Sequence, residues 1–271
     1  MKALTKSKLQ YLRSLSQRKT REREGVFLVE GWHNVQEASG VLKDIEILVY
    51  TKEARENPRH ASILSLARRL CKEEYEASTK DFSLVSDTVT AQGIAAVVKK
   101  FSGFDDNQFD KLLRNENSLV IALDQVADPG NLGAIIRTCD WFGVDAILLN
   151  ENSVELYNPK VVRSTMGSLF HIAILEFSKA TGSFREALDG LRQKGFTLFG
   201  AEVSGTSDIR TIIWPKKSVL VIGNEARGIS PEISNILDQH VSIPKFGKSE
   251  SLNAGVAAGV FLAHRSFQIS K

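Results

Sequence analysis

The stretch LVIALDQVADPGNLGAIIRT, residues 119–138, decides how this chain is interpreted. Its first five residues are all apolar, which is typical of a buried strand. Turn-forming residues follow at 128–131, and residues 132–142 then place apolar side chains at helical spacing before Gly143. A strand, a turn and a helix in that order predict one repeat of a parallel α/β sheet.

The same alternation of strands and helices extends in both directions from this stretch. Further strands are predicted at 146–149, 172–175, 196–199, 219–222 and 241–243, with helices at 159–166, 184–194 and 252–264. Because most of these strands are continuous apolar runs, we expect a mostly parallel sheet with helices on both faces. Before residue 102, strands at 26–29, 45–50 and 94–98 and helices at 30–38, 61–75 and 81–89 predict a small N-terminal α/β domain.

The chain is therefore expected to fold as two α/β domains. Residues 102–118 are rich in Asp, Asn, Ser and Gly and are expected to form a linker, with one helical turn at 112–113. The predicted domains are 1–101 and 119–271. A length of 271 residues is ordinary for two domains.

Composition excludes several classes of protein. The chain is 42% hydrophobic and 25% charged, and no apolar run reaches the roughly 20 residues that span a bilayer. Cys71 and Cys139 are the only cysteines, and the five histidines are scattered, so neither a disulfide framework nor a metal site is expected. We expect a cytoplasmic protein with no membrane segment and no metal.

Positive charge is concentrated near the N-terminus. Residues 1–105 contain 18 Lys and Arg against 14 Asp and Glu, whereas the remainder contains 17 against 18. Arg18, Lys19, Arg21 and Arg23 lie in the most basic part and are candidate contacts to a nucleic-acid phosphate backbone. The alternative is a solvated helix whose charges only keep it soluble.

Three segments that follow predicted strands carry unusual residues, and ligands bind beyond the carboxyl ends of parallel strands. In the first, Asn131 is a candidate helix cap, and Arg137 lies within an apolar helix, where an arginine is rarely buried without a partner. The alternative for Arg137 is a solvent-facing side chain paired with Asp140 or Trp141.

The second and third segments are IGNEARGI, residues 222–229, and IPKFGKSESLNAG, residues 243–255. Gly223 and Gly228 allow a sharp turn and a close approach of backbone to ligand, which alone is a weak signal. Ser251 and Asn253 lie where the closing helix begins, and free N–H groups there can hold a polar ligand. The small residues after Asn253 allow another helix to approach closely, although ordinary tight packing explains them equally well.

Together the three segments resemble the SpoU/TrmH family of RNA ribose methyltransferases in the SPOUT superfamily. Asn131, Gly133 and Arg137 match its Asn-x-Gly-x-x-x-Arg motif, and Gly223, Glu225 and Gly228 match its Gly-x-Glu-x-x-Gly motif. The third motif matches at Ile243, Pro244 and the run Ser251-Leu252-Asn253. The run EGVFLVEG at 24–31 resembles the family's substrate-binding domain more loosely. Two positions vary from many relatives: Gly130, and the pair Ala254-Gly255.

The resemblance implies a trefoil knot in the C-terminal domain, S-adenosylmethionine as cofactor, and a homodimer whose active sites are assembled across the interface. It assigns catalytic positions to Arg137, Asn131, Glu225, Ser251 and Asn253. It assigns cofactor-binding positions to Gly200, Ala201, Ile222, Gly223, Ile243 and Leu252.

The implied reaction is transfer of a methyl group to a ribose 2′-hydroxyl of RNA, with ribosomal RNA favoured over tRNA because of the extra N-terminal domain. Arg137 is a poor general base because its guanidinium stays protonated, so we expect it to hold a phosphate or stabilise oxyanion charge. The competing interpretations are a non-catalytic RNA-binding module of the same fold, a Rossmann-type nucleotide-binding enzyme, which lacks its glycine fingerprint here, and a protein methyltransferase, which no residue supports.

Overall fold

The structure, a computed structural model, describes residues 2–88, 90–101, 114–178 and 182–269. The chain divides into two compact units, residues 1–101 with 155–171, and residues 102–154 with 172–271. Most of the predicted linker, residues 102–113 with its helical turn, lies outside the described residues, and Ser118 already begins a strand.

The first unit is built on a mixed five-stranded sheet of order β1-β4-β3-β5-β2. Its β1, β4 and β3 pair in parallel, whereas β5 runs antiparallel to β3 and β2. The strands are β1 (Lys2–Ala3), β2 (Val26–Glu30), β3 (Ile45–Thr51), β4 (Cys71–Ala77) and β5 (Ile94–Lys99). The helices are α1 (Lys6–Ser14), α2 (Arg18–Glu24), α3 (Trp32–Val41), α4 (Lys52–Glu56), α5 (Ala61–Leu70), α6 (Thr79–Val85) and α9 (Pro159–Ser164), with short 3-10 turns at Pro58–His60 and Ser168–Phe170.

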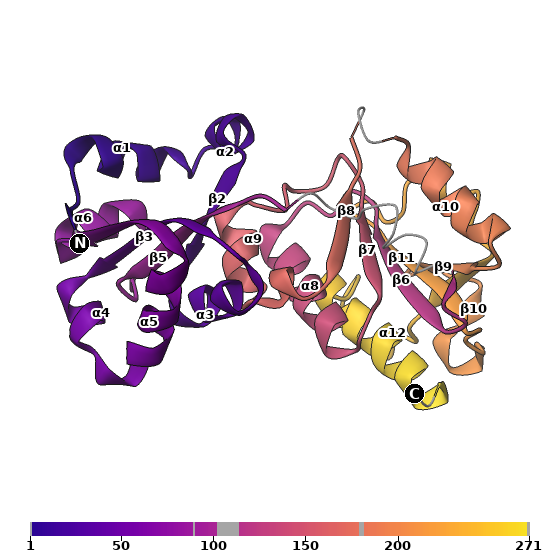
Figure 1. Cartoon of the computed structure of the whole chain (residues 1–271). Helices are drawn as coiled ribbons and strands as arrows, with labels where there is room; N and C mark the ends of the chain where they lie inside the picture. The colour runs from indigo at the N-terminus through magenta and orange to yellow at the C-terminus, as the bar shows by residue number, and fades with distance from the viewer. Residues whose placement is uncertain (1, 89, 102–113, 179–181, 270–271) are drawn as a thin grey trace. The chain divides into compact units, whose positions relative to one another are not determined.

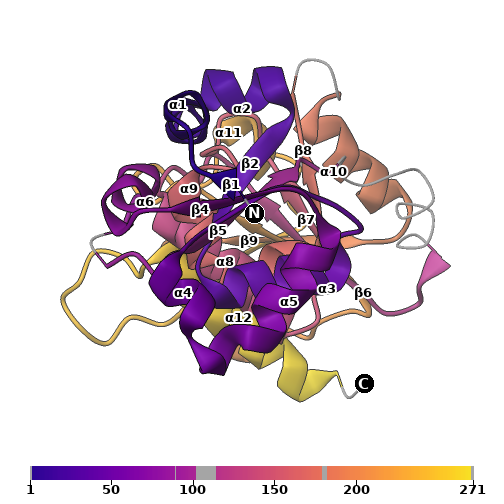
Figure 2. The ribbon, with the colours of Figure 1, turned by 60° about the vertical axis from the view of Figure 1, so that its left-hand side comes forward.

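Helices cover both faces of this sheet. Figures 1 and 2 show α1 and α6 on one side of it and α3, α4 and α5 on the other. Leu12 of α1 and Phe82 of α6 are each 1% exposed and pack with alternate strand residues such as Val49 and Val97. This unit is therefore a mixed sheet covered by helices on both faces.

One predicted helix of this unit is wrong at its end. The expected helix over 61–75 stops at Leu70, and Cys71–Ala77 forms β4, which pairs with β3 and β1. The residues of β4 include three glutamates, so the sequence favours a helix locally. Pairing with two strands and burial of Tyr75 and Ala77 outweigh that weak local preference.

The segment Glu155–His171 belongs to the first unit, although its sequence position falls in the expected second domain. Glu155 is ion-paired with Arg21, and the Tyr157 ring lies 4.6 Å from the Phe27 ring, centroid to centroid. These contacts join residues more than 120 positions apart, which no local sequence pattern could indicate.

The second unit contains a seven-stranded sheet of order β10-β12-β9-β11-β6-β7-β8. Every pairing described in it is parallel, as expected. Its strands are β6 (Ser118–Leu123), β7 (Ala146–Leu149), β8 (Ala173–Glu176), β9 (Thr197–Ala201), β10 (Ser207–Asp208), β11 (Lys217–Ile222) and β12 (Gln239–Ser242). Its helices are α8 (Pro129–Trp141), α10 (Phe184–Gln193), α11 (Pro231–Ser234) and α12 (Ala254–Gln268), with a 3-10 turn at Ile209–Thr211.

Both faces of this sheet are buried. Val120 and Leu148 pack with Leu188 of α10 on one face. Ile121, which follows Val120 and points to the other face, and its β11 partner Leu220 are also 0% exposed. Figure 1 shows α10 on one side of the strands and α8 and α12 on the other. The strand order places β11 between β6 and β9, so the loops after these three strands meet at one edge of the sheet.

Candidate active site

The predicted site residues come from three loops that follow β6, β11 and β12. Asn131 lies in the first turn of α8, Glu225 in the loop after β11, and Asn253 immediately before α12. Since β6 and β11 are parallel neighbours whose last residues, Leu123 and Ile222, pair directly, their following loops start side by side. The topology therefore gathers segments more than 90 residues apart.

A chain of side-chain hydrogen bonds connects these three residues. Asn253 Nδ2 donates to Asn131 Oδ1 at 2.7 Å, and Asn131 Nδ2 donates to Glu225 Oε1 at 2.8 Å. Asn131, Glu225 and Asn253 therefore lie together, although their segments are far apart in the sequence. Within the described part of the chain no hydrogen bond links the Ser251 side chain to these three residues, and the bond found there runs from the Ser249 hydroxyl to the Ser251 carbonyl.

The direction of this series of hydrogen bonds is set by the residues at its two ends. Asn253 Oδ1 accepts from the Gly255 and Val256 N–H groups at 2.9 and 3.3 Å, so its amide nitrogen is left to donate. At the other end, an ionised Glu225 can only accept. Asn131 is consequently held with its nitrogen toward Glu225 and its oxygen toward Asn253.

Glu225 is held by backbone groups as well as by Asn131. The N–H groups of Ala127 and Asp128 donate to its two carboxylate oxygens at 3.3 and 3.4 Å. Burial alone would raise the pKa of Glu225, but the hydrogen bonds from Asn131 and from backbone N–H groups outweigh it and lower that pKa below its usual value. The carboxylate is therefore kept charged near neutral pH.

The helix cap differs from the one expected at this position. Asp128, not Asn131, caps α8, and its side chain accepts from the Asn131 N–H at 2.8 Å. Asp128 precedes Pro129, which suits the first position of a helix because it has no N–H to satisfy. This arrangement frees the Asn131 side chain to join Glu225 and Asn253.

Arg137 does not join this chain of hydrogen bonds. It is exposed on α8, on the stripe that also carries Ala134 and the 84% exposed Trp141. Its side chain faces solvent, as the alternative interpretation expected, but among the residues that the structure describes no hydrogen bond, ion pair or ring contact joins it to Asp140 or Trp141. Its guanidinium is available to another molecule.

The small residues of α12 bring it close to α8, as their sequence pattern indicates. A methyl group added at Gly255 would lie 3.2 Å from the Ala134 side chain, and one added at Gly259 would lie 3.9 Å from Thr138. Apolar side chains stay exposed on α12, where Val256 is 54%, Val260 37% and Phe267 86% exposed, as Trp141 does on α8. An apolar surface thus lies next to Arg137.

Five of the six predicted cofactor positions lie at or directly after the carboxyl ends of β9, β11 and β12. Gly200 and Ala201 end β9, Ile222 ends β11, and Ile243 directly follows β12. Register pairs Ala201 with Ile222 on one side and with Val241 of β12 on the other, so these positions are neighbours. Leu252, half exposed, precedes Asn253.

Gly223 lies where any side chain is excluded. An added Cβ would lie 2.2 Å from the Gly228 carbonyl carbon, because Asn224 and Gly228 exchange backbone hydrogen bonds at 2.9 and 2.8 Å. Gly228 itself has φ +71°, which glycine adopts without strain. The two glycines of the motif therefore close a tight loop that carries Glu225.

The candidate RNA contacts of the basic segment divide into two kinds. Arg18, Lys19 and Arg23 are exposed, and Arg18 and Arg23 pair with neighbouring glutamates on the surface. Arg21 is only 2% exposed and binds Glu155 and the carbonyls of Leu15 and Ser16. Its guanidinium is used inside the first unit and is not offered to RNA.

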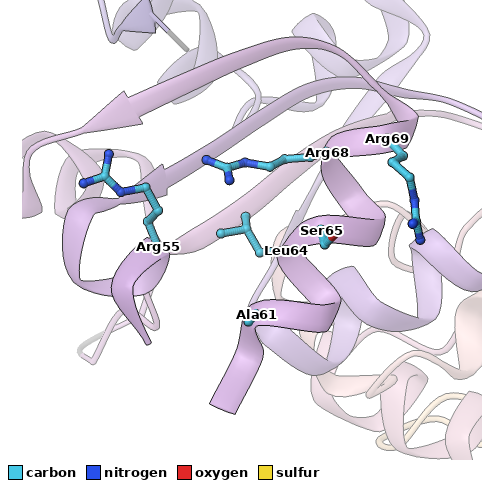
Figure 3. Close-up of a pocket in the computed structure, with 6 residues that line it drawn as sticks. All are labelled: Arg55, Ala61, Leu64, Ser65, Arg68 and Arg69. Atoms are coloured by element: carbon cyan, nitrogen blue, oxygen red, sulfur yellow. The ribbon is translucent and has the colours of Figure 1, made fainter. Parts of the chain in front are cut away.

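A separate hollow of about 330 Å³ lies in the first unit, between α4 and α5 (Figure 3). It is lined by Arg55, Arg68 and Arg69 with Ala61, Leu64 and Ser65. Arg55 is paired with Glu76 and Arg68 with Glu74, each at 2.7 Å. Much of the positive charge of the hollow is therefore already balanced. It contains none of the predicted site residues.

Two absences complete the description. No group of three His, Cys, Asp or Glu side chains among the described residues is arranged to hold a metal ion. None of the helices in the described ranges has both the length and the apolar character needed to cross a bilayer.

The chain is similar to known RNA methyltransferases over nearly its whole length. The Bacillus subtilis (strain 168) 23S rRNA (guanosine(2553)-2′-O)-methyltransferase RlmP is 32% identical over 255 residues, 93% of each chain. The AdoMet-bound rRNA methyltransferase of Sinorhizobium meliloti has a TM-score of 0.84 at 27% identity, over 100% of this chain and 98% of its own. The AdoMet complex of the SpoU methyltransferase AviRb from Streptomyces viridochromogenes has a TM-score of 0.82 at 28% identity, over 97% and 98%.

Family models match both parts of the chain. An MRM3-like substrate binding domain matches residues 6–96, and the SpoU rRNA Methylase family matches residues 118–263. The second match includes all three motif segments, and with them the hydrogen-bonded Asn131, Glu225 and Asn253. The resemblance drawn from those motifs is confirmed, and the chain belongs to the SpoU rRNA methylase family.

Proposed function

We propose that this protein transfers a methyl group from S-adenosylmethionine to a ribose 2′-hydroxyl of ribosomal RNA. The observation that carries the proposal is the hydrogen-bonded chain Asn253–Asn131–Glu225 at the carboxyl edge of a parallel sheet. Ligands of parallel α/β sheets bind at that edge. The relatives described above, which include a 23S rRNA 2′-O-methyltransferase and two AdoMet complexes, support the same assignment.

The residues at this edge suit S-adenosylmethionine. Leu252 is half exposed and Ile243 is partly exposed, and apolar side chains of this kind can cover an adenine ring. The missing side chain of Gly223 makes room for the Gly228 backbone, which closes the loop at this edge. When bound, the cofactor supplies an electrophilic methyl group, and Gly200, Ala201, Ile222, Gly223, Ile243 and Leu252 are the residues we propose to hold it.

The protein's own residues would align the ribose and stabilise charge. In-line geometry between the attacking oxygen and the methyl carbon supplies much of the acceleration in such transfers. We assign Asn131, Glu225, Ser251 and Asn253 to orienting the ribose and Arg137, and we assign Arg137 to the adjacent phosphate or the developing oxyanion. Arg137 stays protonated and does not remove the proton.

We further propose that two copies associate through α8 and α12. Trp141, Val256, Val260 and Phe267 are exposed on these two packed helices, and apolar patches of this kind mark interaction sites. Arg137 lies on the same exposed stripe of α8, outside the hydrogen-bonded chain of its own protomer. In a dimer it would serve the partner's site. We also propose that the C-terminal domain contains the trefoil knot that the family resemblance implies.

The first unit would select the RNA. Arg18, Lys19 and Arg23 are exposed and suited to phosphate contacts, whereas Arg21 is withdrawn from the proposed set. We expect the protein to act in the cytoplasm, where ribosomal RNA is the favoured substrate and tRNA the second candidate. Replacing Arg18, Lys19 and Arg23 together by Ala should then weaken RNA binding far more than cofactor binding, and equal losses would contradict this division.

The direct test is a methylation assay with purified protein, S-adenosylmethionine and transcripts of ribosomal RNA and tRNA. The proposal expects a 2′-O-methyl nucleoside in ribosomal RNA. Tight RNA binding without any methyl transfer would instead support a non-catalytic RNA-binding module.

A further inference from the structure

Asp124 is a buried carboxyl group to which the mechanism above gives no task. It directly follows β6 and is 0% exposed. Its backbone N–H donates to the Ile222 carbonyl at 2.8 Å, which extends the pairing of β6 with β11 by one residue. Its side chain therefore starts from the same edge of the sheet as the proposed cofactor positions.

The two carboxyl oxygens of Asp124 bind two different segments. Oδ2 accepts from the Ser230 N–H at 2.7 Å, and Oδ1 accepts from Asn150 Nδ2 at 3.2 Å. A buried carboxyl group is costly unless it is hydrogen-bonded. Any movement of Ser230 away from Asp124 would leave the carboxyl group with too few partners, so the loop after β11 is held at its far end.

The start of the same loop is anchored to Gln125, the residue that follows Asp124. Asn224 Nδ2 donates to the Gln125 carbonyl at 2.8 Å. Gln125 has φ +61°, a conformation that non-glycine residues adopt rarely and at a cost, and it turns this carbonyl toward the loop. Glu225 lies between these two anchors.

We propose that Asp124 is a positioning residue for methyl transfer, holding the Gly223–Ser230 loop through the Ser230 N–H so that Gly223 and Glu225 keep their places in the site. The inference rests on the proposed function, because cofactor and ribose are what the loop would serve. Asp124 acts through the loop and touches neither of them. Asn150 is its partner in this role.

The hydrogen-bonding pattern around Asp124 suggests a test in which Asp124 and Asn150 exchange residue types. In Asp124→Asn, an amide oxygen turned toward Ser230 leaves the amide nitrogen facing Asn150 Nδ2, so two donors meet. Asn150 cannot turn over without loss, because its Oδ1 accepts from the Asn152 N–H at 2.8 Å. Adding Asn150→Asp restores an acceptor opposite the new donor and keeps the bond to Asn152.

The experiment compares full-length wild type, Asp124→Asn, Asn150→Asp and the double variant. Affinity for S-adenosylmethionine is measured by calorimetry, and kcat and KM are measured with RNA. A mismatched buried hydrogen bond should weaken cofactor binding and raise the cofactor KM by about tenfold in each single variant. The double variant should recover to within about threefold of wild type, since the donors and acceptors match again.

A control lies at the opposite edge of the same sheet, at an exposed aspartate. Asp145 precedes β7, and its carboxyl group accepts from the Leu119 N–H at 2.8 Å. Asp145→Asn should lower the midpoint of urea unfolding yet leave the cofactor affinity unchanged. Equal effects of Asp124→Asn and Asp145→Asn on affinity would reduce Asp124 to a structural residue and overturn the proposal.

Two further outcomes are decisive. A double variant that remains as impaired as either single variant, in folding or in binding, overturns the proposal. If wild type itself fails to bind S-adenosylmethionine, the proposed function fails. Hydrogen exchange then tests the loop anchor separately: amides of residues 224–230 should exchange faster in Asp124→Asn than in wild type, and unchanged exchange would refute the anchor.

Discussion

Asn253 donates its side-chain N–H to the side-chain oxygen of Asn131 at 2.7 Å, across 122 positions of sequence. The same Asn253 caps α12, since its oxygen accepts from Gly255 and Val256. One side chain therefore starts the closing helix and also ties it to the first turn of α8. The link is directional, because each end of the chain permits only one orientation of the amides.

Asn253→Asp should break this link without breaking the helix cap. A carboxylate still accepts from the two helix N–H groups, and aspartate is as good a cap as asparagine. Its other oxygen would face Asn131 Oδ1, so two acceptors meet, and we expect kcat to fall by about tenfold or more. Circular dichroism should be unchanged. Asn158→Asp, at the cap of α9, is the control and should retain full activity.

Glu225 should make the stability of the protein depend on pH in the acid range. Its pKa is lower in the folded protein than in the unfolded chain, so the carboxylate stabilises the fold fully only above its unfolded pKa. That stabilisation is lost as pH falls through the lower, folded pKa. Urea unfolding across this range should show wild type more stable than Glu225→Gln near neutral pH, with the difference shrinking in acid. A difference that is constant with pH would contradict the ionised Glu225.

Gly223→Ala should damage the site by steric exclusion. The new methyl group would lie 2.2 Å from the Gly228 carbonyl carbon, so the backbone of the loop has to move. We expect loss of cofactor binding together with lower stability, measured by calorimetry and urea unfolding. Gly190→Ala in α10 is the matched control, because nothing lies within 4 Å of the added methyl group there, and it should be neutral or stabilising. Normal cofactor affinity in Gly223→Ala would argue against the loop as part of the site.

Arg21→Ala should destabilise the first unit strongly. It removes the closer partner of the buried Glu155 and leaves that carboxylate with only the longer pair to Lys100 at 3.6 Å, which costs about 3–5 kcal/mol. Arg18→Ala removes an exposed pair with Glu22 and should cost at most about 1 kcal/mol. Denaturant titration of the two variants measures this contrast. Similar small losses in both would mean that Arg21 is not the structural residue described above.

Arg137→Ala should abolish methylation and leave folding and cofactor binding intact, because its side chain is exposed. If Arg137 serves the partner's site, mixing this variant with Glu225→Ala should restore part of the activity, since some mixed dimers then contain one complete site. A mixture that stays inactive, although mixed dimers form, would place Arg137 in its own protomer's site.

Local sequence patterns were sufficient for the parallel sheet and for the motif loops. Apolar strands such as Leu119–Leu123 are buried on both faces, and the glycines of the loop after β11 are where a tight turn requires them. The prediction that was wrong depends on contacts between residues far apart in the sequence. The helical pattern through residue 75 continues past Leu70 in sequence, but pairing with β3 turns Cys71–Ala77 into a strand.

Side-chain roles within the site were harder to foresee than its location. Asn131 has the residue type of a helix cap, and only the neighbouring Asp128 frees it for Glu225. Arg21 has the charge expected of an RNA contact, yet Glu155, 134 positions away, holds it inside the fold. Asp124 belongs to no motif element that was singled out, and its role depends on Ser230 and Asn150 coming to it in the folded chain.

The central claim is that this chain methylates a ribose 2′-hydroxyl of ribosomal RNA from S-adenosylmethionine. The most direct measurement incubates purified protein with S-adenosylmethionine carrying an isotopically labelled methyl group and unmodified ribosomal RNA, and then identifies the labelled nucleoside by mass spectrometry. The account predicts label in a 2′-O-methyl nucleoside at a defined position with wild type, and none with Arg137→Ala. Label on a base or on protein, or no transfer to any RNA by a folded wild-type protein, would contradict it.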